Sequence, residues 1–62
     1  MMNELQRLLR WAKRHKLFIE IFTDGSVEIE QMDSDDAFHR LASGPTLLAA
    51  LRRARKALER GT

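Results

Sequence analysis

The residues that could do chemistry are few, and the densest group is the run Asp33-Ser34-Asp35-Asp36. A carboxylate run with this spacing can open a calcium-binding loop. Such a loop needs Gly at its sixth position and Glu at its twelfth, where this chain has Phe38 and Gly44. We therefore interpret the run as a helix cap, because carboxylates stabilise a first helical turn, and we predict no metal site and no cofactor.

Candidate catalytic residues are also few. The histidines are His15 and His39, and no serine sits between the glycines of a nucleophile elbow. Glu20 and Glu28 could form a carboxylate pair, but on an open sheet face nothing would raise either pKa or exclude water. The sequence therefore predicts a protein that is not an enzyme.

Residues 16–32 carry the strongest structural signal, a β-hairpin. Apolar residues alternate on both sides of a turn that contains Asp24-Gly25, which is a strong hairpin cue. A three-residue loop places Ile21 opposite Val27, whereas a two-residue loop would set glutamates opposite isoleucines, so the apolar pattern selects the longer loop. The inner face of the hairpin then consists of Leu17, Ile19, Ile21, Val27 and Ile29.

The outer face of this hairpin mixes acids with large apolar side chains. Glu20 lies opposite Glu28, a like-charge pair that costs roughly a few tenths of a kcal/mol. The apolar residues on this face are either covered by another part of the chain or form a contact surface for a second molecule. The candidate protein-contact residues are Phe18, Glu20, Phe22, Glu28, Glu30 and Met32.

Two amphipathic helices flank the hairpin, over residues 3–15 and 45–60. Asn3 and Gln6 form a capping-box-like pair at the start of the first, whose apolar stripe is Leu5, Leu8, Leu9 and Ala12. The stripe of the second consists of Leu47, Ala50, Leu51, Ala54 and Leu58. Between the two helices, residues 33–43 favour a short helix of about two turns, and a third strand over residues 37–42 is the alternative, because two strands alone are marginal. The predicted fold is a single α+β domain over residues 1–62, in the order helix, β-hairpin, short helix or third strand, helix. Both long helices are predicted to pack on the inner face of the hairpin.

Charge is distributed unevenly along the chain. Residues 1–16 have a net charge of +4, residues 17–39 of −7 and residues 40–62 of +5, which together give the +2 of the chain. Glu is nearly absent from the basic helix faces, whereas a solvated face would normally mix signs. Basic residues with an interleaved tryptophan are typical of nucleic-acid binders. The nucleic-acid candidates are Arg7, Arg10, Trp11, Lys13, Arg14, Arg52, Arg53, Arg55, Lys56 and Arg60.

The size of the chain limits what it can build. Sixty-two residues make one domain with a small core, and without cysteine no disulfide can staple it. Small unstapled domains often gain stability by association, so we predict a homodimer. No signal-peptide or membrane-spanning stretch is evident in the sequence, which indicates a cytoplasmic protein with no membrane partner.

The stretch of residues 42–58 reads Ala-Ser-Gly-Pro-Thr-Leu-Leu-Ala-Ala-Leu-Arg-Arg-Ala-Arg-Lys-Ala-Leu. It is loosely similar to the last helix of double-stranded-RNA-binding domains, where a glycine-containing turn leads into an alanine-rich helix. Those domains place paired lysines at the start of the helix, and this chain has Leu47 and Leu48 there. The resemblance covers about a quarter of the chain, and the RNA-binding function is not carried over.

These observations predict a small non-enzymatic protein-binding module of the regulator, inhibitor or adaptor type. A protein partner would be bound through the hairpin, and the module itself is expected to be a homodimer. The alternative is a nucleic-acid-binding module that uses the two basic helix faces.

Overall fold

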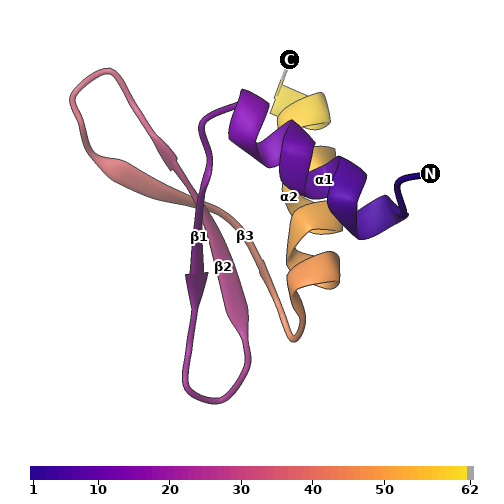
Figure 1. Cartoon of the computed structure of the whole chain (residues 1–62). Helices are drawn as coiled ribbons and strands as arrows, with labels where there is room; N and C mark the ends of the chain where they lie inside the picture. Colours follow the sequence, from indigo (N-terminus) through magenta and orange to yellow (C-terminus); the bar gives the residue numbers. More distant parts are fainter. Residues whose placement is uncertain (62) are drawn as a thin grey trace.

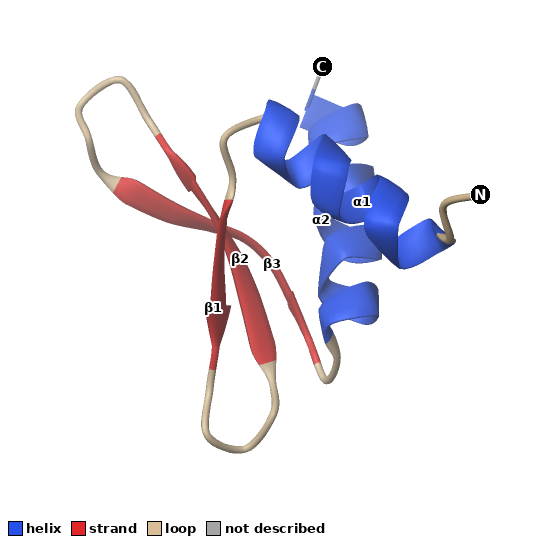
Figure 2. Ribbon diagram, in the orientation of Figure 1, coloured by secondary structure: helices blue, strands red, loops and turns tan. Residues whose placement is uncertain are grey.

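The computed structural model describes residues 1–61 and has two helices and a three-stranded sheet (Figure 1). The sheet is antiparallel with strand order β1-β2-β3 (Figure 2), which confirms the α+β class. The elements, in chain order, are α1 (Glu4–Arg14), β1 (Phe18–Ile21), β2 (Val27–Met32), β3 (Phe38–Gly44) and α2 (Leu47–Gly61).

Helix α1 begins with a complete capping box. The Asn3 side chain accepts a hydrogen bond from the Gln6 backbone N–H at 2.8 Å, and the Gln6 side chain accepts from the Asn3 N–H at 3.0 Å. These two bonds satisfy backbone donors that a helix start leaves unpaired. The apolar stripe points inward, with Leu8 and Ala12 both 2% exposed, as the spacing predicted.

The register of the β1–β2 hairpin is the predicted one. Ile21 lies opposite Val27, and Ile19 lies opposite Ile29. Gly25 has φ of +89°, a left-handed conformation that glycine adopts at little cost. The apolar pattern therefore identified the correct loop length.

Residues 33–43 form a tight turn and the strand β3, so the favoured short helix was wrong and the alternative, a third strand, is confirmed. The Asp33 carboxylate accepts from the backbone N–H groups of Asp35 and Ala37, at 2.8 and 2.9 Å, and so closes the turn instead of starting a helix. The Asp33 N–H also donates to the Ala37 carbonyl at 2.9 Å. Strand β2 thereby has a partner on each side, which removes the weakness of an isolated hairpin.

The helices cover only part of the sheet. Both lie on one side of it (Figure 1), where α2 packs against β3 and β2, and α1 packs against α2. Gly44 permits the close approach of α2, because a Cβ there would lie 2.8 Å from the Ala50 backbone nitrogen. The buried side chains of the described part of the chain are Leu8, Ala12, Val27, Ile29, Ala50, Leu51 and Ala54.

One part of the predicted core is not buried. Ile19 and Ile21 lie on the inner face with Val27 and Ile29, yet their residues are 37% and 65% exposed. The reason is geometric, because the helices lie over β2 and β3 and leave β1 at an uncovered edge. None of the described helices is both long enough and apolar enough to cross a membrane.

Candidate contact surface on β1 and basic surface on the helices

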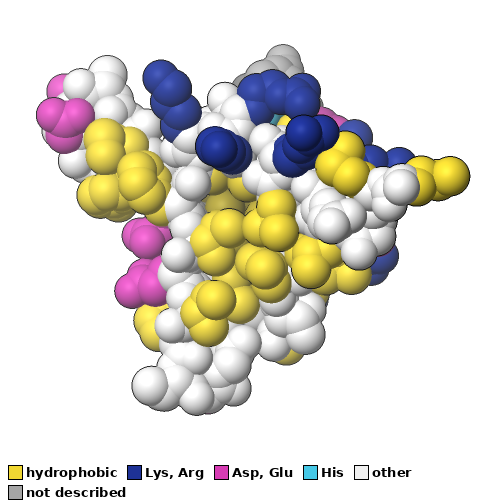
Figure 3. Space-filling model, viewed as in Figure 1, with side chains coloured by type: hydrophobic (Ala, Val, Ile, Leu, Met, Phe, Trp, Pro, Cys, Tyr) yellow, Lys and Arg dark blue, Asp and Glu magenta, His cyan; other side chains and the backbone are white. Residues whose placement is uncertain are grey.

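Strand β1 presents apolar side chains that the rest of the described chain covers only in part. Ile19 and Ile21 lie on its inner face, and Phe18, at 44% exposed, lies on its outer face. Figure 3 shows hydrophobic atoms gathered in the middle of one face of the molecule, between the strands and α1. Each side of β1 therefore offers apolar contacts to a second molecule.

The backbone of β1 offers hydrogen-bonding groups at the same place. The Phe22 N–H donates to the Ser26 carbonyl at 2.9 Å across the turn. In an antiparallel pair, residues that bond across the ladder alternate with residues whose backbone groups point the other way. The register therefore directs the N–H and C=O groups of Ile19 and Ile21 away from β2, to the free edge.

The outer face carries an aromatic cluster that lies partly outside the predicted residues. Phe18 and Phe38 meet edge to face with ring centroids 5.0 Å apart, and Phe38 pairs with Met32 across β2 and β3. Phe38 is 52% exposed, and Met32 and Phe22 are each 39% exposed. Phe38 was not among the predicted contact residues, because residues 33–43 were predicted to form a short helix; the alternative third strand over residues 37–42 includes it.

The acidic part of the outer face is compact. Carboxylate oxygens of Glu20, Glu28 and Glu30 lie within 4.8 Å of one another, and could together hold a cation. Partial desolvation raises the pKa of Glu30, and the neighbouring charges of Glu20 and Glu28 raise it further. A guanidinium already lies beside this group, because Arg40 is 3.7 Å from Glu28. Proximity of surface carboxylates does not by itself indicate a metal site, and we assign none here.

Asp33 and His39 form a polar pair at the β2–β3 turn. The His39 Nε2 contacts the Asp33 carboxylate, which also accepts the two turn N–H groups. The bond from His39 and the backbone donors lower the pKa of Asp33 below its ordinary value of 3.8. The carboxylate is occupied by the turn that it closes, so the pair acts as a structural element.

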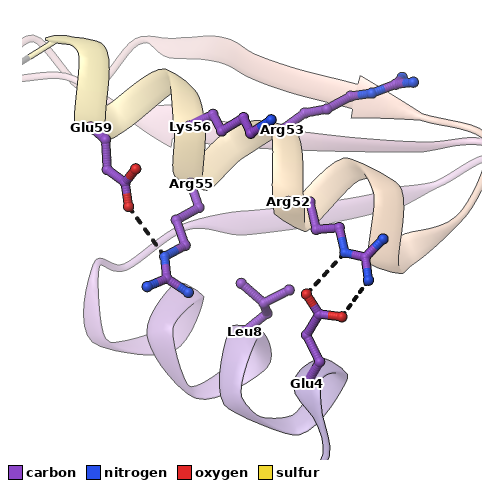
Figure 4. A pocket seen from close by; sticks show the side chains of 7 residues that line it. All are labelled: Glu4, Leu8, Arg52, Arg53, Arg55, Lys56 and Glu59. Carbon is purple, nitrogen blue, oxygen red and sulfur yellow. Dashed lines mark hydrogen bonds and ion pairs between the residues drawn. The ribbon is translucent and has the colours of Figure 1, made fainter.

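Most of the predicted nucleic-acid residues lie in one of two groups, which share Arg55, whereas Lys13 and Arg60 belong to neither. Three arginines of α2 are already engaged around a concavity of about 390 Å³ between the helices (Figure 4). Arg52 pairs with Glu4, with Nε 2.9 Å from Oε2, which lowers the pKa of Glu4 and raises that of Arg52. Arg53 donates to the Ser43 carbonyl at 3.0 Å, and Arg55 to Glu59 at 3.3 Å. The contacts of Arg52 and Arg53 tie α2 to α1 and β3, and that of Arg55 lies within α2.

The second group surrounds Trp11 in a shallow concavity of about 300 Å³. Trp11 is half-buried, and its ring lies 5.0 Å from that of His15, centroid to centroid. Lys13, Lys56 and Arg60 do not line this concavity. The residues that do are Met2, Arg7, Arg10, Trp11, Arg14 and Arg55. The structure thus joins cations from both helices around one aromatic side chain.

Comparisons with protein-family models, with curated protein sequences and with solved structures find no match for this chain. The start of α2 also differs from the double-stranded-RNA-binding pattern in its role. Leu47 and Leu48, at the positions of the paired lysines in that pattern, are half-buried and pack against the core.

Proposed function

We propose that this chain is a small non-enzymatic protein-binding module whose contact surface is strand β1. The observation that carries the proposal is the exposure of Ile19 and Ile21 on an otherwise buried sheet face, beside a free strand edge. An extended segment of a partner could add to this edge as a fourth strand, with backbone bonds for affinity and side-chain contacts for selectivity.

Two further features support a protein partner. The exposed side chains on both faces of β1 are large and apolar, and aromatic residues are enriched in protein contact surfaces. The acids Glu20, Glu28 and Glu30 beside them would disfavour nucleic acid at this surface, because they would repel phosphates.

Selection from a display library of random peptides tests this proposal. Selected peptides are expected to have apolar residues at every second position and to shift the NMR signals of residues 17–22 of the protein. Ile21→Lys should abolish their binding, because it places a charge on the apolar side of the edge. Arg53→Gln, on the far helix, is the matched control and should bind normally. Peptides that instead shift signals only on α1 or α2 would contradict the proposal.

A second candidate function, nucleic-acid binding, rests on the concavity around Trp11. A base could stack on the indole ring while phosphates pair with Arg7, Arg10 and Arg14. None of these three makes a close ion pair within the described residues, although the charge of Arg7 acts on Glu4. Arg52 is excluded from this role because Glu4 already neutralises it.

Fluorescence anisotropy of labelled single-stranded and duplex oligonucleotides across salt concentrations tests this candidate. Specific contact is expected to weaken linearly in log salt and to quench the fluorescence of Trp11, which is the single tryptophan of the chain. Arg10→Glu with Arg14→Glu should remove binding, whereas Arg52→Gln should leave it nearly unchanged. Absence of binding at low salt would eliminate the candidate.

A further inference from the structure

We propose that β1 binds the β1 strand of a second copy of this chain, antiparallel, about a two-fold axis that passes between the two Ile19 residues. The inference rests on the proposed function, because it names the partner of that same edge. The result is a continuous six-stranded sheet in a symmetric dimer.

The backbone groups at the edge fit this pairing. The N–H and C=O groups of Ile19 and Ile21 point outward, and continued alternation places the Leu17 carbonyl at the same edge. The Leu17 N–H is unavailable, since it donates to Ala12 at 2.9 Å. With the axis at Ile19, each Ile19 N–H meets the carbonyl of the partner's Ile19, and each Ile21 N–H meets that of the partner's Leu17. This pairing therefore does not require the Leu17 N–H, which is already bonded to Ala12.

Charge favours this register over the one that has its two-fold axis at Glu20. Moving the axis by one residue would set Glu20 against the partner's Glu20, and each of these belongs to a cluster whose carboxylates already lie within 4.8 Å. Like charges directly opposite each other destabilise a sheet. With the axis at Ile19, Glu20 instead lies opposite the partner's Phe18, and the two acidic clusters are displaced from each other.

The two ends of β1 are also complementary in charge when the strands run antiparallel. Helix α1 ends with Lys13 and Arg14 just before β1, and the turn after β1 contains Asp24. Antiparallel pairing brings the basic end of one copy toward the acidic turn of the other, and symmetry repeats this contact. A two-fold interface needs such self-complementarity, because the same patch meets itself.

The side chains explain why a second copy fits the inner face. Ile19 would lie beside the partner's Ile19, and Ile21 beside the partner's Leu17, so the row of apolar side chains continues across the axis. These are the inner-face residues that the helices leave uncovered. Pairing would bury part of their surface and satisfy the free edge with the same contacts.

Cysteine cross-linking tests the register, and the native chain contributes no cysteine of its own. Opposed residues of a hydrogen-bonded antiparallel pair have Cα atoms about 5.5 Å apart, within the range of disulfides. Ile19→Cys is therefore expected to form a cross-linked dimer under mild oxidation. Glu20→Cys and Ile21→Cys are the matched controls and should stay uncross-linked. Preferential cross-linking of Glu20→Cys would overturn the proposed register.

Analytical ultracentrifugation of the unmodified protein tests the dimer itself. The expected mass is twice that of the 7.2 kDa chain at micromolar concentration, and Ile19→Lys should reduce it to that of one chain. Circular dichroism should show that this variant keeps the native secondary structure, since Ile19 lies outside the buried core. A native chain that sediments as a monomer across micromolar concentrations would overturn the inference.

Hydrogen exchange provides a readout that needs no variant. The amides of Ile19 and Ile21 should gain protection as protein concentration rises, while that of Phe22, bonded within the hairpin, should change little. A monomer that still binds selected peptides at residues 17–22 would overturn the second-copy inference and leave the proposed function standing. A monomer that binds none there would contradict both.

Discussion

The two outer strands of the sheet lie on opposite sides of β2 and have different surroundings. Strand β3 lies under α2, whereas β1 lies at an edge with apolar side chains exposed on both faces. The contrast is sharpest within the β1–β2 hairpin, where Ile29 is fully buried and its direct partner Ile19 is 37% exposed. Two isoleucines on one face, in register, therefore belong to different environments.

This difference shows that a period-two pattern indicates on which face of the sheet a side chain lies. It does not indicate whether another element covers that face. Coverage depends on where the helices lie, and two helices cannot span three strands when one of them packs mainly on the other. The uncovered strand is then available for association. The following predictions test how sharply the two regions differ.

The largest effect is expected from Ile29→Ala, in the covered region. Removing three carbons from a fully buried site should lower the free energy of unfolding by about 2–5 kcal/mol, through lost transfer energy and a cavity. Ile21→Ala, measured in dilute protein, should change the free energy of unfolding by about 0.5 kcal/mol or less. Urea denaturation of both variants measures the difference, and equal losses would refute the contrast between the strands.

The next largest effect is expected from Gly44→Ala, where α2 contacts the end of β3. The added Cβ would meet the Ala50 nitrogen at 2.8 Å, so the helix must shift, at a cost of about 1–3 kcal/mol. Ser43→Ala, at the exposed neighbouring position, is the control and should cost about 0.5 kcal/mol or less. Thermal denaturation of the two variants compares them. Similar stabilities would mean that the approach of α2 is not tight.

A smaller effect is expected from Asn3→Ala at the start of α1. Loss of the side-chain acceptor leaves the Gln6 N–H without its cap and should destabilise the fold by about 0.5–2 kcal/mol. Asn3→Ser keeps an acceptor and should retain most of the stability. Chemical denaturation of the two variants would show whether the cap matters; equal losses would assign the effect to another property of Asn3.

The smallest effect is expected from pH, because solvent still reaches both of the half-buried carboxyl groups concerned and screens their charge. The lowered pKa of Asp33 means that its contribution is present above its ordinary pKa of 3.8 and is lost as pH falls through the lowered value. The raised pKa of Glu30 acts in the opposite direction, so its contribution is complete below 4.5 and is lost as pH rises above that. Stability profiles from acid to neutral pH for Asp33→Asn and Glu30→Gln should each lose the corresponding slope.

Local patterns predicted much of the fold. The capping box at Asn3, the hairpin register and the apolar stripe with Ala50, Leu51 and Ala54 all follow from patterns of residues near in sequence. Strand β3 was predicted only as the alternative to a short helix, because an aspartate can cap a helix or close a turn with the same carboxylate. The choice depended on β2, whose second edge gives residues 38–44 a partner.

Local patterns also placed some of the candidate contact residues on the correct face of the sheet. Phe18, Phe22 and Met32 were identified by alternation and are exposed in the structure. The pairing of Arg52 with Glu4 was not foreseen, since these residues lie 48 positions apart and meet only when the helices pack. The gathering of Arg7, Arg10 and Arg14 with Arg55 around Trp11 also needed that packing.

The sequence by itself determined the elements that depend on short-range patterns: both helices, the hairpin, its register and the faces of its side chains. Tertiary structure alone decided which apolar residues are buried, because burial depends on the position of distant elements. The helices settle over β2 and β3, where small residues such as Gly44 and Ala50 allow close contact. Strand β1 is therefore left with its apolar side chains and free edge exposed.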